Sequence, residues 1–173
     1  MPSAPGLFQK YADALRKEAA KNAGFFTAAQ AREAGYADSV HGYHVDHGDW
    51  IRVQRGIYRL AEIPAPARPE LVAFSLWSRD REGHPQGVFT HDTAREIHGF
   101  AHFNGGPAHM TVPRSFRKNA ETPEGLVLHK DDLAPNQWEQ RDGYRVLRAE
   151  LCGGPTASSV RHPYDDTIAR GED

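Results

Sequence analysis

The fold is decided by residues 25–60, FFTAAQAREAGYADSVHGYHVDHGDWIRVQRGIYRL. Residues 28–34 predict a short helix because they are rich in good helix formers. Thr27 precedes them and can cap the helix with its hydroxyl, and Gly35 follows where helices commonly end in a left-handed residue. A second helix is predicted over residues 39–47, between a capping Asp-Ser pair and a glycine stop.

The end of this stretch predicts a two-stranded ribbon. Residues 50–53 and 57–60 are rich in β-branched and aromatic side chains, and Gly56 between them is free to take a positive φ. Alternation along the strands predicts two faces. The inward face would hold Ile51, Val53, Tyr58 and Leu60, and the outward face Trp50, Arg52 and Arg59. Two helices followed by such a ribbon are the outline of a winged helix-turn-helix, which is a DNA-binding module.

The second helix has one face suited to the core and one suited to a DNA groove. At about 100° per residue, one arc collects the side chains expected to face the core. These are Val40, His41, His44 and Val45. The opposite side, with His47 at its border, would enter the major groove, so Ser39, Tyr43 and His47 are the candidate base readers.

The ribbon supplies candidate phosphate contacts. Arg52 and Arg59 are predicted to point outward, and Arg55 lies at the tip beside Gln54. Arginine side chains suit phosphate contact. The alternative is a charged face that contacts only solvent. The predicted DNA-contacting residues are therefore Ser39, Tyr43, His47, Arg52, Gln54, Arg55 and Arg59.

The segment AGYADSVHGYHVDHGDWIRVQRGIYRL, residues 34–60, resembles the N-terminal winged-helix domain of AbiEi-type antitoxins, the repressor partners in type IV toxin–antitoxin operons. A second block extends the resemblance, which runs from about residue 25 to residue 148. It consists of GVFTHDTAREIHGF, HMTVPRSFR, EGLVLHKDDL and GYRV in that order. Proteins of this kind show a strand, a Ser/Thr-His-x-Thr-Ala helix and a strand ending in VP-x-x-x-R.

The resemblance implies a sequence-specific DNA-binding repressor that acts as an antitoxin. Its expected partners are the double-stranded DNA of its own operator and a nucleotidyltransferase-like toxin, and no cofactor is expected. Proteins of this kind usually continue after the GYRV-type strand with an Arg-Thr-Leu-rich helix. That helix is missing here, so we expect a C-terminally truncated or frame-shifted relative.

The predicted fold class is α+β, with two domains and a tail. Residues 1–64 are predicted to be the winged helix-turn-helix, opened by an amphipathic helix over residues 7–21, and to fold and bind DNA alone. Three prolines within residues 63–69 predict a linker. Residues 69–148 are predicted to be a small α+β domain with a mostly antiparallel sheet, and residues 149–173 a disordered tail. The predicted elements of the second domain are helices over 70–79 and 92–98, strands over 109–112, 125–129 and 144–147, and a turn with a short helix within 131–141.

Composition limits the class of protein. The 173 residues are 39% hydrophobic and 25% charged, and the formal net charge is −2. Residues 1–64 hold 8 basic and 7 acidic side chains, so specific DNA binding would need locally placed charge. The single cysteine, Cys152, excludes an internal disulfide and a cysteine zinc cage. No apolar stretch predicts a signal peptide or a membrane span, so we expect a cytoplasmic protein.

Two alternatives to the repressor hypothesis remain open. The first is a protein-interaction module whose winged helix has lost affinity for DNA. The second is a histidine-dependent metal enzyme, but the helical angles spread His41, His44 and His47, and Gly99 interrupts the spacing of His98 and His102. We therefore predict no metal site and no catalytic residue, since a phosphate-binding loop is also missing.

Overall fold

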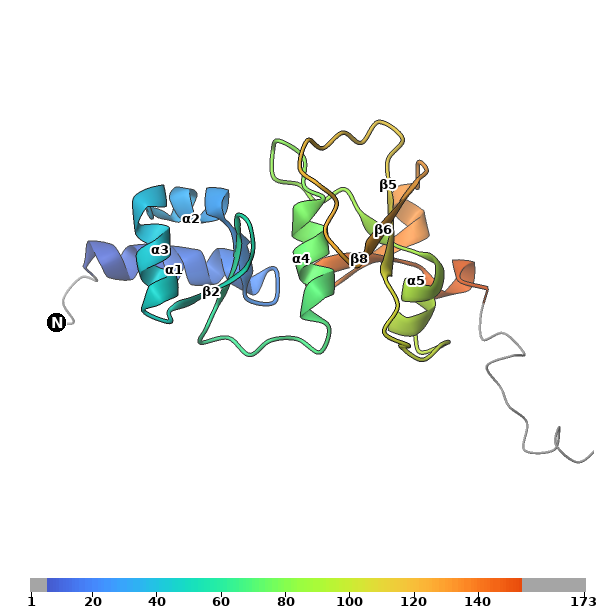
Figure 1. The fold of residues 1–173 in the computed structure, drawn as a ribbon, viewed down its shortest axis with the longest axis horizontal. Helices are drawn as coiled ribbons and strands as arrows, with labels where there is room; N and C mark the ends of the chain where they lie inside the picture. Colours follow the sequence, from blue (N-terminus) through green and yellow to red (C-terminus); the bar gives the residue numbers. More distant parts are fainter. Residues whose placement is uncertain (1–5, 154–173) are drawn as a thin grey trace, which may run out of the picture.

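The structure is a computed structural model, and it describes residues 6–153. Figure 1 shows two groups of elements with a helix between them. The first group contains α1 (Leu7–Ala20), β1 (Phe25–Thr27), α2 (Ala28–Ala34), α3 (Asp38–Asp46), β2 (Trp50–Gln54) and β3 (Ile57–Leu60). Its strands form an antiparallel sheet in the order β1-β3-β2. This group is a winged helix-turn-helix, in which β2 and β3 form the wing.

The second group follows α4 (Pro69–Trp77), the helix between the two groups. It contains β4 (Val88–Phe89), α5 (His91–Ile97), β5 (Ala108–Val112), β6 (Leu126–Lys130), η1 (Pro135–Gln137), β7 (Trp138–Arg141), β8 (Tyr144–Leu147) and η2 (Ala149–Leu151). The strand order is β6-β5-β4-β8-β7. The α+β class predicted from the sequence is therefore confirmed.

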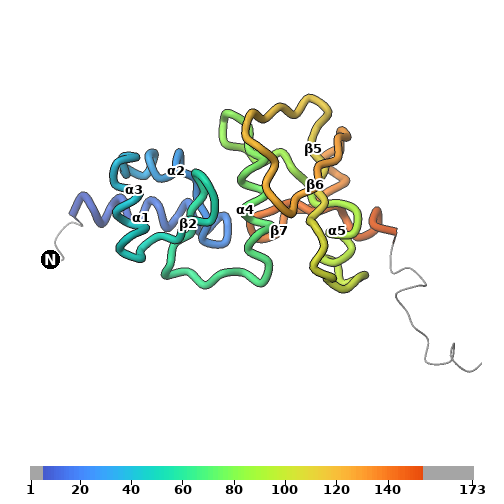
Figure 2. Tube along the Cα trace, viewed as in Figure 1, coloured from blue at the N-terminus to red at the C-terminus, as the bar shows by residue number. Residues whose placement is uncertain are grey.

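The second sheet is mixed, which corrects the prediction of a mostly antiparallel sheet. β4 pairs antiparallel with β5, and β7 with β8, whereas β4–β8 and β5–β6 are parallel. The long connection over residues 113–125 brings the chain back to the end of the sheet where β5 begins, so β6 runs in the same direction as β5 (Figure 2). Strand patterns alone do not reveal such a return.

The region before β8 also differs from the prediction. The expected short helix is only the 3₁₀ turn η1, and the chain then forms β7. Trp138 opens this strand, where Arg145 of β8 lies 4.4 Å from the centre of its ring. An aromatic side chain that packs across a strand pair favours a hairpin over a helix.

α2 begins and ends as the sequence predicts. The Thr27 hydroxyl accepts from the Gln30 N–H at 3.2 Å, and the Gln30 side chain accepts from the Thr27 N–H at 2.9 Å. Gly35 ends the helix with φ +115°. A side chain at this glycine would collide with the ring of Tyr11 on α1, so the glycine also allows the two helices to approach closely.

The faces of β2 are opposite to the prediction. Trp50 is 3% exposed, whereas Ile51 and Val53 are 40% and 37% exposed. Trp50 pairs with Leu60 across the ribbon, and its ring centroid lies 4.9 Å from that of Phe26. The indole determines which side of β2 faces the helices, because burying it removes more apolar area from water than burying Ile51 or Val53.

The two groups share a core across the first sheet. Phe25 and Ile57 are fully buried on the face opposite Trp50, and they belong to one cluster with α4 and the second sheet. α4 contacts β1 and β3 on one side and β8 on the other. The first group also has a core of its own, which includes Phe26 and Trp50, so the Pro-rich segment does not mark the boundary between the two cores. A division into domains 1–64 and 69–148 stays a prediction.

The predicted disordered tail lies largely outside the described residues, which end at Gly153. Within the described part, residues 149–151 form η2. Between residues 6 and 153, no helix combines the length and the apolar character that crossing a membrane requires.

Candidate nucleic-acid interface

α3 turns its candidate base readers away from the core. Ser39, Tyr43 and His47 are all exposed, Tyr43 by 55%. His41 is buried on the opposite side, where its Nε2 donates to the carbonyl of Tyr36 at 3.1 Å. Val40 was expected to face the core, but it is 37% exposed because it lies at the edge of the buried arc.

Tyr43 and His47 form a pair on the exposed side of α3. Their rings stack with centroids 3.7 Å apart, and His47 Nδ1 donates to the Tyr43 carbonyl at 2.8 Å. The stacked imidazole limits the rotamers open to Tyr43. Fewer rotamers mean a smaller entropy loss when the phenol meets a partner.

The wing presents two arginines without carboxylate partners. Arg52 and Arg55 are exposed, and within residues 6–153 neither has a carboxylate at ion-pair distance. Arg52 lies 5.8 Å from the centre of the Tyr58 ring. Gln54 is half-buried at the base of the tip, and Gly56 closes the turn with φ +73°. Both guanidinium groups are therefore available to an anion.

Arg59 is separated from these arginines. It pairs in register with Phe25 and Ile51, so it lies on the face of the sheet turned toward α4. It is half-buried, and its Nη1 donates to the Ile63 carbonyl at 2.6 Å. The predicted site therefore divides, with Ser39, Tyr43, His47, Arg52 and Arg55 exposed and Arg59 engaged within the fold.

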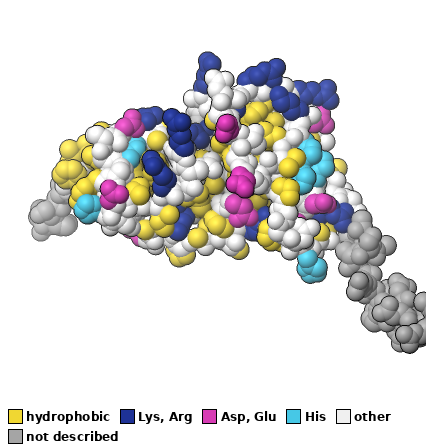
Figure 3. Space-filling view, viewed as in Figure 1, with side chains coloured by type: hydrophobic (Ala, Val, Ile, Leu, Met, Phe, Trp, Pro, Cys, Tyr) yellow, Lys and Arg dark blue, Asp and Glu magenta, His cyan; other side chains and the backbone are white. Residues whose placement is uncertain are grey.

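Sequence reasoning missed a basic groove at the far end of α4, which we call the basic rim. Its volume is about 350 Å³, and its cations are Arg79, Arg81, Arg117 and Lys118. Figure 3 shows Lys and Arg side chains gathered along the upper edge of the molecule. The rim joins residues almost forty positions apart, so no local pattern could have revealed it.

Packing and a hydrogen bond hold two of the cations of the basic rim, Lys118 and Arg79, in place. Lys118 Nζ donates to the Arg79 carbonyl at 3.0 Å and lies 5.6 Å from the centre of the Trp77 ring. Burial lowers the pKa of both Lys118 and Arg79 from their ordinary values. The carboxyl group of Asp80 accepts the N–H of His84 at 2.8 Å, and backbone hydrogen bonds lower its pKa.

The wing tip lies beside this rim. Gln54 and Arg55 line a cleft of about 710 Å³ together with Phe74, Trp77 and residues 119–124. A side-chain carbon at Gly56 would lie 3.9 Å from Arg79 Nη2. The charged tip of the wing and the cations of the second group therefore share one side of the molecule.

The matched part of the chain is the part that carries α3 and the wing. Residues 13–61 match the model of a protein family described as "Transcriptional regulator, AbiEi antitoxin". This segment therefore resembles an AbiEi-type regulator domain. The match runs from within α1 to the residue after β3, and AbiEi antitoxins are regulators rather than a class of enzyme. A search of curated proteins finds no match to the chain. The resemblance of residues 87–148 to AbiEi-type proteins stays a prediction.

The histidines considered as metal ligands are dispersed. His41 is buried, and His44 and His47 stack on different rings, Trp50 and Tyr43. His98 Nε2 donates to the Leu147 carbonyl at 2.7 Å, while His102 is exposed. Among residues 6–153, no three His, Cys, Asp or Glu side chains converge as metal ligands.

Proposed function

We propose that this AbiEi-type protein is a DNA-binding repressor that recognises the operator of its own operon and acts as a type IV antitoxin. The observation that carries the proposal is the combination, within the matched segment, of an exposed helix face and two unpaired wing arginines. The exposed face of α3 fits the major groove, and the adjacent wing fits the flanking backbone.

Phosphate contacts supply most of the expected affinity. α3 carries no Lys or Arg, so we assign the phosphate contacts to Arg52 and Arg55 and, beyond the wing tip, to Arg81 and Arg117. Four phosphate contacts would give a slope of log affinity against log salt of about −3.6. The basic rim thus brings the second group into the interface, and DNA binding is not confined to residues 1–64.

The direct test is a fluorescence anisotropy titration of the full chain on the DNA upstream of its own gene and on a random duplex. A salt series from about 50 to about 200 mM gives the slope for each duplex. We expect tighter binding to the upstream DNA, with a steep salt dependence on both. Equal affinity for the two duplexes would exclude sequence-specific recognition.

A second candidate function is a partner-binding module without DNA affinity. The observation that favours it is the charge of α3, where Asp46 is exposed and Asp38 already pairs with Arg32 at 2.8 Å. A helix with carboxylates and no cation approaches DNA less favourably than a basic one. Absence of binding to either duplex at about 50 mM salt would favour this candidate.

The antitoxin role is tested separately in cells. Co-expression with a nucleotidyltransferase-like toxin from the same operon should restore growth when the full chain is present. We expect Tyr43→Ala to lose repression and to keep this rescue, because Tyr43 lies on the exposed face of α3. Failure of the full chain to restore growth would contradict the antitoxin proposal.

A further inference from the structure

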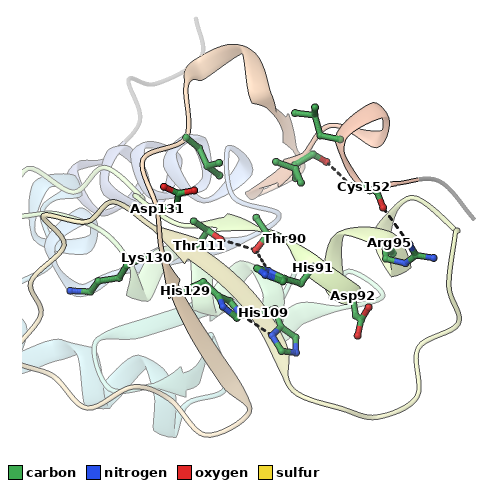
Figure 4. A pocket seen from close by; sticks show the side chains of 13 residues that line it. Thr90, His91, Asp92, Arg95, His109, Thr111, His129, Lys130, Asp131 and Cys152 are labelled. Atoms are coloured by element: carbon green, nitrogen blue, oxygen red, sulfur yellow. Dashed lines mark hydrogen bonds between the residues drawn. The ribbon is translucent and has the colours of Figure 1, made fainter. Parts of the chain in front are cut away.

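Three histidines from separate elements meet on the second sheet. His91 opens α5, His109 lies on β5 and His129 on β6. The ring centroids are 3.9 Å apart for His91 and His129, 5.2 Å for His109 and His129, and 5.8 Å for His91 and His109. Figure 4 shows the three rings side by side in a cavity of about 640 Å³.

Two of the imidazoles share a hydrogen bond. His109 Nδ1 and His129 Nε2 are 2.9 Å apart, so one nitrogen donates its proton and the other accepts. The pair keeps this bond when both rings are neutral or when one is a cation. When both are cations, each of the two nitrogens carries a proton, so the bond is lost and two positive charges face each other.

The third histidine is anchored to the sheet in a strained conformation. His91 has a φ of +55°, which is unusual for a residue other than glycine. Its Nδ1 lies 2.8 Å from Thr90 Oγ1, which lies 2.8 Å from Thr111 Oγ1 on β5. Both threonines are buried. The Thr90 hydroxyl therefore connects α5 to the sheet and makes no capping hydrogen bond to the helix.

The backbone of β5 strengthens this connection. The His109 N–H donates to Thr93 Oγ1 on α5 at 2.8 Å. The start of α5 is thus held to the sheet by hydroxyl groups and by the histidine cluster. From this helix, His91, Asp92 and Arg95 line the cavity, whereas Ala94 is buried in the core on the other side.

Most charged groups around the cluster have partners elsewhere. Lys130 Nζ donates to the Phe116 carbonyl at 3.1 Å, Asp131 pairs with Arg114 at 3.0 Å, and Arg95 donates to the Cys152 carbonyl at 3.3 Å. Asp92 points away from the three rings (Figure 4). Burial, and then the charges of His91 and His109, lower the pKa of His129. The surroundings therefore favour the neutral form of His129.

We propose that His91, His109 and His129 form an acid-sensitive latch that holds α5 against β5 and β6 when neutral and releases α5 when more than one ring is protonated. The pKa of His129 is depressed in the closed state, so the opened state binds more protons. A fall in pH therefore favours opening. Closure is therefore complete above the ordinary histidine pKa of about 6.5 and is lost as the pH falls below it.

The test is hydrogen–deuterium exchange of the full chain at about pH 7.5 and about pH 5.5, on either side of the ordinary histidine pKa. After correction for intrinsic rates, α5 should lose up to about tenfold in protection, because the lower pH lies about one unit below the ordinary histidine pKa, while β1 and β3 keep theirs. His129→Gln should remove most of this loss, because glutamine can bond to His109 without titrating. His102→Gln, at an exposed position, should behave as the wild type.

Equal loss of α5 protection in the wild type and in His129→Gln would overturn the proposal, as would no loss in the wild type. Should His129→Gln fail to fold, an NMR titration of the wild-type imidazoles decides. The latch is supported if the titration midpoint of His129 lies below about pH 6.5 and is shifted by the protonation of a neighbouring histidine. Three independent titrations at the ordinary value contradict it.

Discussion

The two halves of the molecule assemble their polar side chains in different ways. The exposed residues of α3 and the wing lie between positions 39 and 55, so one helix and one ribbon bring them together. The histidine cluster joins positions 91, 109 and 129, and the basic rim joins the residues just after α4 to the loop after β5. Local periodicity therefore finds a site built on one element, whereas a site built across a sheet becomes visible only in the folded chain.

The shared core sets a limit to this contrast. Phe25 and Ile57 lie in the first sheet but pack with the core of the second group. The first half keeps a core of its own around Phe26 and Trp50, but Phe25 and Ile57 tie its sheet to the core of the second half. Residues 1–64 alone would expose both side chains to water, and their independent folding stays a prediction.

The largest expected effect tests this shared interior. Phe25→Ala should lower the free energy of unfolding by about 3–5 kcal/mol, since it leaves a cavity among fully buried side chains. Chemical denaturation followed by tryptophan fluorescence and by circular dichroism should give one coincident transition. Phe8→Ala, at a side chain that is 83% exposed, is the matched control. Two separate transitions in the wild type would mean that the halves fold independently.

The next effect concerns α3. Tyr43→Ala should cost roughly 1–3 kcal/mol of binding to the upstream DNA and much less on a random duplex, because the phenol is expected to contact bases. Anisotropy titrations on both duplexes measure the difference. An equal loss on both would place Tyr43 against the phosphate backbone instead.

The wing allows a matched comparison of two arginines on the same ribbon. Arg55→Ala should reduce the slope of log affinity against log salt by about 0.9, as expected for one lost phosphate contact. Arg59→Ala should leave the slope unchanged, because Arg59 is half-buried and donates to Ile63. A change in slope for Arg59→Ala alone would reverse the assignment of the two faces of the ribbon.

The last prediction tests whether the second half joins the interface. Arg117→Ala should also reduce the salt slope by about 0.9, and on every duplex alike, since a phosphate contact carries no sequence information. Arg148→Ala removes an exposed cation after β8, away from the basic rim, and is the control. If the slope stays the same for Arg117→Ala, DNA binding is confined to α3 and the wing.

Local sequence determined the elements of the first half. Thr27 with Gln30 and the glycine at position 35 define α2, because capping hydrogen bonds and left-handed backbone depend on nearby residues only. The exposed side of α3 followed from its helical period, and the strand boundaries of the wing from β-branched and aromatic content. The resemblance to AbiEi antitoxins in this segment rested on the same residues and is confirmed by the family match.

Tertiary structure alone decided which way each strand faces and which distant residues meet. Alternation gives two faces of β2, but only the packing of Trp50 against Phe26 decided that Ile51 and Arg59 share the opposite face, on the side of α4. The parallel pairing of β5 with β6 likewise depends on a long return of the chain, and that pairing brings His109 beside His129. These outcomes depend on contacts between residues far apart in sequence, whose free energies no local pattern contains.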